Sequence, residues 1–224
     1  MKKTNLAIAL LLGTSVLAAS MPASAQLAQM RGMLPGGART SGAASVDPDA
    51  FLAETIETTK FMMVAASVLA SAADTDAERD ARRAEIAAIQ GASDIGELNA
   101  QRASFAANAE AVSLNMGDAQ AAQAQYDSLT RDQQQQMLSA AYNFALGMAR
   151  NVQLAQQAPQ LVSSMQSNPM LLRRVGSIRT AGGLLTQQAQ LARSMAGPLR
   201  ALLSRGGVEV PADAHTAEPR PVEL

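Results

Sequence analysis

The densest group of potential metal-binding side chains lies between residues 74 and 85. Counting Asp74 as position 1, carboxylates fall at positions 1, 3, 5, 7 and 12, which is the ligand spacing of an EF-hand calcium loop. Position 6 is Arg79, where the sharp turn of that loop requires glycine. Thr75 and Glu78 also form a capping box, and acids are favourable in a first helical turn. We therefore predict a helix start here, with no metal site and no cofactor.

Few other side chains in this sequence offer catalytic chemistry. The chain has no Cys and one histidine, His215, which stands among Pro, Asp and Glu near the C-terminus. A thiol nucleophile and a Cys-rich zinc site are therefore excluded, and a histidine-dependent triad would have to use His215. Paired carboxylates could hydrolyse a sugar substrate, but there is no Trp to form a sugar platform. We expect a non-enzymatic protein without a small-molecule substrate, and a carboxylate-based hydrolase is the least favoured alternative.

The first 25 residues have the three parts of a secretory signal peptide. A basic Met-Lys-Lys start precedes an apolar run over residues 6–19, and Ala23 and Ala25 give the small-x-small pattern of a cleavage site. We predict cleavage between Ala25 and Gln26 and a periplasmic or secreted location in a bacterium. The lack of Cys suits such a compartment, because it avoids unwanted disulfides.

The remaining chain divides into a helical domain and two loose ends. Residues 26–46 are rich in Gly and small polar residues, and residues 206–224 contain three prolines. We predict a flexible linker and a disordered tail, respectively, around a helical domain at 47–205. The longest apolar stretch after the signal, residues 61–73, is too short to span a membrane and is expected to lie in a core helix.

Cap signals and helical periodicity within residues 47–205 predict an all-α fold. Asp47-Pro48 is typical of a helix start, and apolar residues of the segment 95–116 repeat in steps of three and four, as in a coiled coil. Pro159 is expected to end one helix, and Gly197-Pro198 to break or kink the last one. With 47 Ala in 224 residues, we predict an Ala-rich bundle of about four to six helices. Because each Ala buries little area, self-association could supply further burial.

One short motif has a counterpart in a known family. Leu129-Thr-Arg-Asp-Gln133 resembles the Leu-Thr-x-x-Gln motif of small periplasmic helical chaperones of the Spy and CpxP type. This resemblance implies a cradle that binds unfolded client proteins. The same residues also form a capping box preceded by a hydrophobic residue, so a holdase-like chaperone is the second functional hypothesis.

Charge is distributed very unevenly along the chain. Residues 47–132 carry 15 acids and six basic residues, whereas residues 133–208 carry seven arginines and no acid. We expect the two halves to pair inside one bundle, or the arginines to bind an anionic membrane surface or acidic polymer. Because the mature chain is net acidic, we expect no nucleic-acid partner.

The last helical segment is the candidate for such an anionic partner. Arg193, Arg200 and Arg205 lie among apolar residues that could share one face. That face would be either buried in the bundle core or presented to a membrane; we favour the core. The sequence thus predicts an exported, non-enzymatic helical protein that acts by binding a protein partner, itself or an anionic surface. The apolar residues concerned are Leu184, Leu185, Leu191, Met195, Leu199, Leu202 and Leu203.

Overall fold

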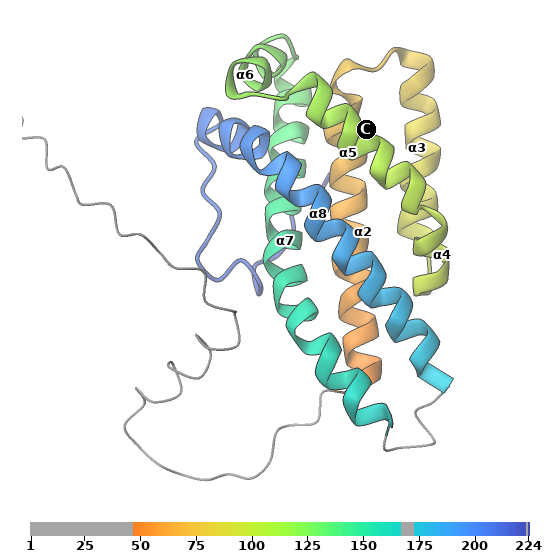
Figure 1. Cartoon of the computed structure of the whole chain (residues 1–224). Coiled ribbons are helices and arrows are strands. Elements are labelled where there is room, and N and C mark those ends of the chain that lie inside the picture. Colours follow the sequence, from red (N-terminus) through yellow and green to blue (C-terminus); the bar gives the residue numbers. More distant parts are fainter. Residues whose placement is uncertain (1–46, 167–172, 223) are drawn as a thin grey trace, which may run out of the picture. The chain divides into compact units, whose positions relative to one another are not determined.

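Helices account for all the regular secondary structure in the computed structural model, which describes residues 47–166, 173–222 and 224. This part of the chain has seven α-helices, one short 3-10 helix and no strand (Figure 1). The all-α prediction is confirmed, with more helices than the four to six predicted. The elements are α2 (Pro48–Ala70), η1 (Ser71–Ala73), α3 (Asp76–Gly91), α4 (Ile95–Ala100), α5 (Arg102–Asn115), α6 (Ala119–Asp127), α7 (Arg131–Gln166) and α8 (Val175–Arg205).

Local capping signals set the predicted helix starts. The Asp47 carboxylate accepts a hydrogen bond from the main chain of Asp49 at 3.0 Å, directly before the proline that begins α2. Thr75 and Glu78 form the reciprocal capping box of α3. The predicted box before α7 is present as well, since Thr130 and Gln133 bond to each other's main chain. These three starts are confirmed.

Two features account for the extra helices. The periodicity of the segment 95–116 continues without a break, which is typical of a single helix, but the structure interrupts the segment at Gln101 and forms α4 and α5. Helix α6 was not predicted, because its Ala- and Gln-rich sequence lacks an apolar stripe; its signal is Asp118, which caps the main chain of Ala121 at 2.8 Å. The apolar positions expected in the segment 95–116 are nevertheless all buried: Ile95, Leu98, Phe105, Ala109, Val112 and Met116.

Both internal prolines lie within helices, so the helix end predicted at Pro159 and the break predicted at Gly197-Pro198 are wrong, whereas a kink at Gly197-Pro198 stays a prediction. Helix α7 continues past Pro159 to Gln166, and α8 runs unbroken through Pro198. Proline removes one hydrogen bond of a helix interior. Continuing α7 beyond the proline buries Leu161 and Met165 in the core, which offsets that loss.

Helix α2 is the central element of the unit formed by residues 44–224. It contacts α3, α4, α5, α7 and α8 (Figure 1). The approach of α7 is close because Gly147 has no side chain: a Cβ atom there would lie only 2.3 Å from Met62 Cγ. Pro48–Ala73 is the one described segment with the length and apolar composition to cross a membrane. Because 67% of its most apolar window is buried, it has the character of a core helix.

The C-terminal segment differs from the predicted disordered tail. It has no regular secondary structure, as its prolines suggest, but it packs against the helices from Gly207, a turn residue with φ of 63°. Ala214 is only 6% exposed, and Val222 and Leu224 pack against the core. The prediction failed because docking depends on partners in α3 and α7, far away in the sequence. The predicted signal peptide and linker, residues 1–25 and 26–46, lie outside the described residues.

Candidate functional site

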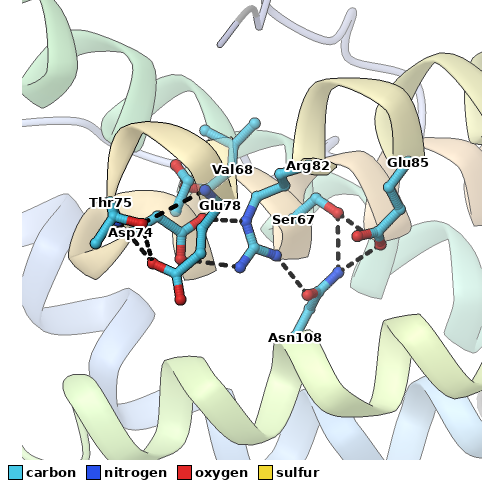
Figure 2. A network of polar contacts seen from close by, with 9 residues as sticks. Ser67, Val68, Asp74, Thr75, Glu78, Arg82, Glu85 and Asn108 are labelled. Carbon is cyan, nitrogen blue, oxygen red and sulfur yellow. Dashed lines mark hydrogen bonds and ion pairs between the residues drawn. The ribbon is translucent and has the colours of Figure 1, made fainter. Parts of the chain in front are cut away.

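A polar network joins α2, α3 and α5 (Figure 2). Asn108 of α5 donates from Nδ2 to the Ser67 hydroxyl at 2.8 Å and to Glu85 Oε1 at 2.7 Å. The Ser67 hydroxyl donates to the same carboxylate oxygen at 2.9 Å. Arg82 completes the network by donating from Nη1 to Asn108 Oδ1 at 2.6 Å. Three helices are thereby tied together by side chains that lie far apart in the sequence.

Arg82 also forms a two-bond ion pair with Asp74. Its Nε donates to Asp74 Oδ2 at 2.5 Å and its Nη2 to Oδ1 at 3.1 Å, the fork geometry of a strong arginine–carboxylate pair. The two side chains are only 14% and 11% exposed. Arg82 and Asp74 bind each other, and the Glu85 carboxylate is bound by the neutral Ser67 and Asn108, so the network holds α3 against α2 and α5.

The acids of the EF-hand spacing do not form a calcium loop. Asp76, Glu78 and Asp80 lie on helix α3, and Asp74 is bound by Arg82. Among the described residues, no three His, Cys, Asp or Glu side chains are grouped to hold a metal ion. The predicted helix start is therefore the observed structure.

Glu78 has a lowered pKa. The main-chain N–H of Thr75 donates a hydrogen bond to its carboxylate at 2.7 Å and lowers the pKa most, and the Thr75 hydroxyl donates a second bond at 2.7 Å. Desolvation opposes these two hydrogen bonds and raises the pKa, and the positive charge of Arg82 lowers the pKa by less than desolvation raises it. The pKa shift is thus explained by helix capping rather than by a catalytic arrangement.

The apolar face of α8 lies in the core. Leu184, Leu185, Met195, Leu199, Leu202 and Leu203 are buried, and Leu191 is half-buried. This agrees with the core alternative that the sequence favoured for this segment.

The arginines predicted to flank that face separate into two kinds. Arg193 and Arg200 are exposed, with no ion pair among the described residues. Arg205 instead binds Asp127 of α6, with its Nη2 3.1 Å from Oδ1. Arg193 and Arg200 are seven residues apart, a step that turns the side chain by only about 20° around an ideal helix. Arg205 follows Arg200 by five residues, a step that turns the side chain by about 140°. Arg205 therefore points away from the other two. Arg179, which no apolar pattern marked in the sequence, is also exposed and lies on the face of Arg193 and Arg200.

Some arginines of the acid-free region pair with the acidic half, as the charge layout suggested. Arg150 Nη1 lies 3.4 Å from Glu57 Oε1, and Arg174 Nη2 lies 3.0 Å from Asp49 Oδ1. With Arg205, three of the seven arginines thus have acidic partners in helices α2 and α6. Internal charge pairing and an exposed basic face coexist in the molecule.

The end of the chain lies beside two hollows between α2, α3 and α7, one of about 450 Å³ at residues 219–222 and one of about 310 Å³ at Leu224. The two hollows share no lining residue, and we name them together the α2–α3–α7 channel. Asn143 of α7 binds the main chain of Arg220 there. No sequence signal marked this site, because its lining combines single residues from three helices with the distant C-terminus.

The other predicted positions lie outside these sites or at their edges. Leu129 and Gln133 of the Leu-Thr-x-x-Gln motif line the 310 Å³ cavity, and Gln133 also serves the capping box. His215 is exposed beside a shallow hollow on α7. The predicted cleavage-site residues Ala23, Ala25 and Gln26 lie outside the described residues. Comparisons of the chain with protein-family models, curated proteins and solved structures found no match.

Proposed function

We propose that this is an exported, non-enzymatic protein of a bacterial envelope that acts by binding, with the exposed face of α8 directed at an anionic lipid surface. The observation that carries this proposal is the exposed face formed by Arg179, Arg193 and Arg200. Export rests on the secretory signal pattern at the N-terminus.

The charge of α8 supports an anionic partner. The helix contains no acid, so none of its own residues neutralises the three arginines. In an ideal helix, Arg179 and Arg200 would differ by only about 60° around the axis, which places all three on one side. A basic residue near an anionic membrane surface contributes about 1 kcal/mol of binding free energy. Since the apolar face of α8 is buried, the attraction would be electrostatic and would weaken with salt.

Vesicle binding by the mature protein tests this function. Vesicles of 30% phosphatidylglycerol in phosphatidylcholine should bind at low salt and release the protein at high salt. The Arg193→Gln and Arg200→Gln double variant should bind about 30-fold more weakly, because two contributions of about 1 kcal/mol are lost. The matched control replaces Arg102 and Arg131, two exposed arginines of other helices, and changes net charge equally. Equal losses of vesicle affinity in both variants, or no vesicle binding at all, would contradict a specific lipid-binding face. Binding to an acidic polysaccharide but not to vesicles would identify a polymer as the partner instead.

A holdase-like chaperone is the second candidate function. The supporting observation is that Leu129 and Gln133 line the cavity beside Leu224, so the motif borders a hollow with both apolar and charged lining residues. A holdase should suppress the thermal aggregation of an unfolded client such as citrate synthase at equimolar ratio. Leu129→Asp should reduce that suppression while leaving vesicle binding unchanged, which separates the two functions.

A further inference from the structure

The α2–α3–α7 channel is covered by an extended segment rather than by a helix. Phe61, Val64 and Val68 of α2 recur at helical spacing along its floor. Residues 219–222 and Leu224, here named the C-terminal strap, lie over them. Val222 and Leu224 pack against the core as partly buried side chains. The strap therefore provides cover for an apolar strip of the central helix.

The channel recognises the main chain of its occupant. Asn143 donates from Nδ2 to the carbonyl oxygen of Arg220 at 2.7 Å and accepts from the Arg220 N–H at 2.7 Å. This is the two-bond exchange of a paired residue in an antiparallel sheet, supplied here by one side chain. Arg83 Nε also donates to the main-chain oxygen of Leu224 at 3.0 Å. Contacts of this kind accept any extended segment, as in binding by strand addition.

Side-chain contacts add a sequence preference. The Arg220 guanidinium carbon lies 4.1 Å from the centre of the Tyr142 ring, a cation–π contact. Pro219 and Pro221 flank Arg220 and favour an extended backbone. The preferred occupant thus carries a basic residue between prolines, followed by apolar residues two and four positions later.

The strap does not fill the space it covers. Cavities of about 450 and 310 Å³ remain beside it, within the size range of ligand pockets. The strap has no regular secondary structure and its apolar side chains are only partly buried, as in the parts of a protein that open at low free-energy cost. A ligand with larger apolar side chains in place of Val222 and Leu224 would fill the channel better than the strap does.

We propose that the α2–α3–α7 channel is a binding site for an extended segment of a partner protein with the pattern Pro-basic-Pro-apolar-x-apolar. The strap occupies the site in the free protein and is displaced when the partner binds. This site is separate from the arginine face of α8, so either proposal can fail without the other.

Peptide binding measures whether the strap competes for the channel. The probe is a fluorescein-labelled peptide with the sequence of residues 217–224, followed by anisotropy. A tethered strap competes at an effective concentration of about millimolar, so wild type should bind the probe weakly. The full-length Val222→Asp and Leu224→Asp double variant should bind it at least tenfold more tightly, because its own strap no longer docks. Val210→Asp, at an exposed valine of the same C-terminal segment, is the matched control and should bind like wild type.

A second variant tests the site itself. In the double-variant background, Asn143→Leu should weaken probe binding at least tenfold, whereas Asn115→Leu, at an exposed asparagine of α5, should not. A scrambled peptide of equal composition should bind weakly. Equal probe affinity in wild type and double variant, or no effect of Asn143→Leu, would overturn the proposal.

Wild-type protein gives an independent readout that does not depend on variants folding. Excess unlabelled peptide should speed amide exchange at Arg220, because displacement of the strap breaks the bond from its N–H to Asn143 Oδ1; unchanged exchange would contradict displacement. Light scattering tests whether the strap of a second copy of this chain occupies the channel instead. A wild-type dimer that becomes monomeric in the double variant would show that each channel holds the strap of a second copy, which would also overturn the proposal.

Discussion

Gln188 of α8 donates a 2.9 Å hydrogen bond from Nε2 to the hydroxyl of Thr59 in α2, and both residues are fully buried. Gln188 Oε1 accepts a further bond of 2.7 Å from Asn151 Nδ2 of α7. One side chain thus joins the three longest helices of the described structure. If one helix shifted along another, these buried polar groups would lose their partners. The bonds therefore fix the positions of α2, α7 and α8 along one another, which the small Ala side chains on their surfaces specify poorly.

Removing the centre of this relay should be costly. Gln188→Leu leaves the Thr59 hydroxyl and the Asn151 amide without their partner, so we expect a loss of roughly 2–4 kcal/mol in the free energy of unfolding. The control Gln153→Leu, at an exposed position of α7, should change it by less than about 0.5 kcal/mol. The triple variant with Thr59→Val and Asn151→Leu should recover much of the loss. Urea denaturation measures all three, and a Gln188→Leu variant as stable as wild type would contradict the relay.

Arg82 should matter for stability through its two partners. Arg82→Met leaves the Asp74 carboxylate and the Asn108 amide oxygen without their donor at largely buried positions. Breaking a buried pair in this way is strongly destabilising, and partial exposure reduces the effect to roughly 2–4 kcal/mol. Arg79→Met removes a long 3.9 Å pair with an exposed partner and should cost less than about 1 kcal/mol. Thermal unfolding of the two variants would show comparable losses if the network were unimportant.

Alanine substitution at two glycines should change the stability of the fold in opposite directions. A Cβ at position 147 would overlap Met62, so Gly147→Ala should destabilise the fold by about 1–3 kcal/mol. At Gly183 in α8 a Cβ meets open space, and Gly183→Ala should stabilise the fold by about 0.5–1 kcal/mol through the better helix propensity of Ala. Denaturation midpoints measure both effects, and destabilisation at both positions would show that helix propensity does not decide the outcome at Gly183.

The capping box of α3 should make stability depend on pH. The pKa of Glu78 is lowered below its ordinary value of 4.5 because Thr75 donates hydrogen bonds to the ionised carboxylate. The folded state therefore binds fewer protons, so the stabilisation is complete above pH 4.5 and is lost as pH falls through the folded pKa. Relative to Glu78→Gln, wild type should lose stability as the pH falls below 4.5. A constant difference over that range would contradict the assignment.

Processing of the N-terminus tests the predicted location. Signal peptidase cleavage after Ala25 should give a mature protein that begins at Gln26, which mass spectrometry of the exported protein would detect. Ala23→Leu removes a small residue of the cleavage site and should cause the uncleaved precursor to accumulate. A stable full-length form in the cytoplasm of wild-type cells would contradict export.

Local sequence signals predicted those features that depend on residues a few positions apart. Asp47 caps a main-chain group two residues away, and the boxes at Thr75 and Thr130 span three residues. The apolar periodicity of residues 95–116 identified the buried face of two helices because 3.6 residues per turn relate neighbours on one side. The composition and these signals were sufficient for the all-α fold class.

Only the tertiary structure decided the features that depend on distant partners. Pro159 lies within α7 because burial of Leu161 and Met165 beyond it offsets a lost hydrogen bond. Arg205 is paired with Asp127, 78 residues earlier in the chain, and the C-terminal segment is bound by Asn143, 77 residues before Arg220. No local pattern encodes these pairings, because their free energy arises only when packed helices bring the two groups together.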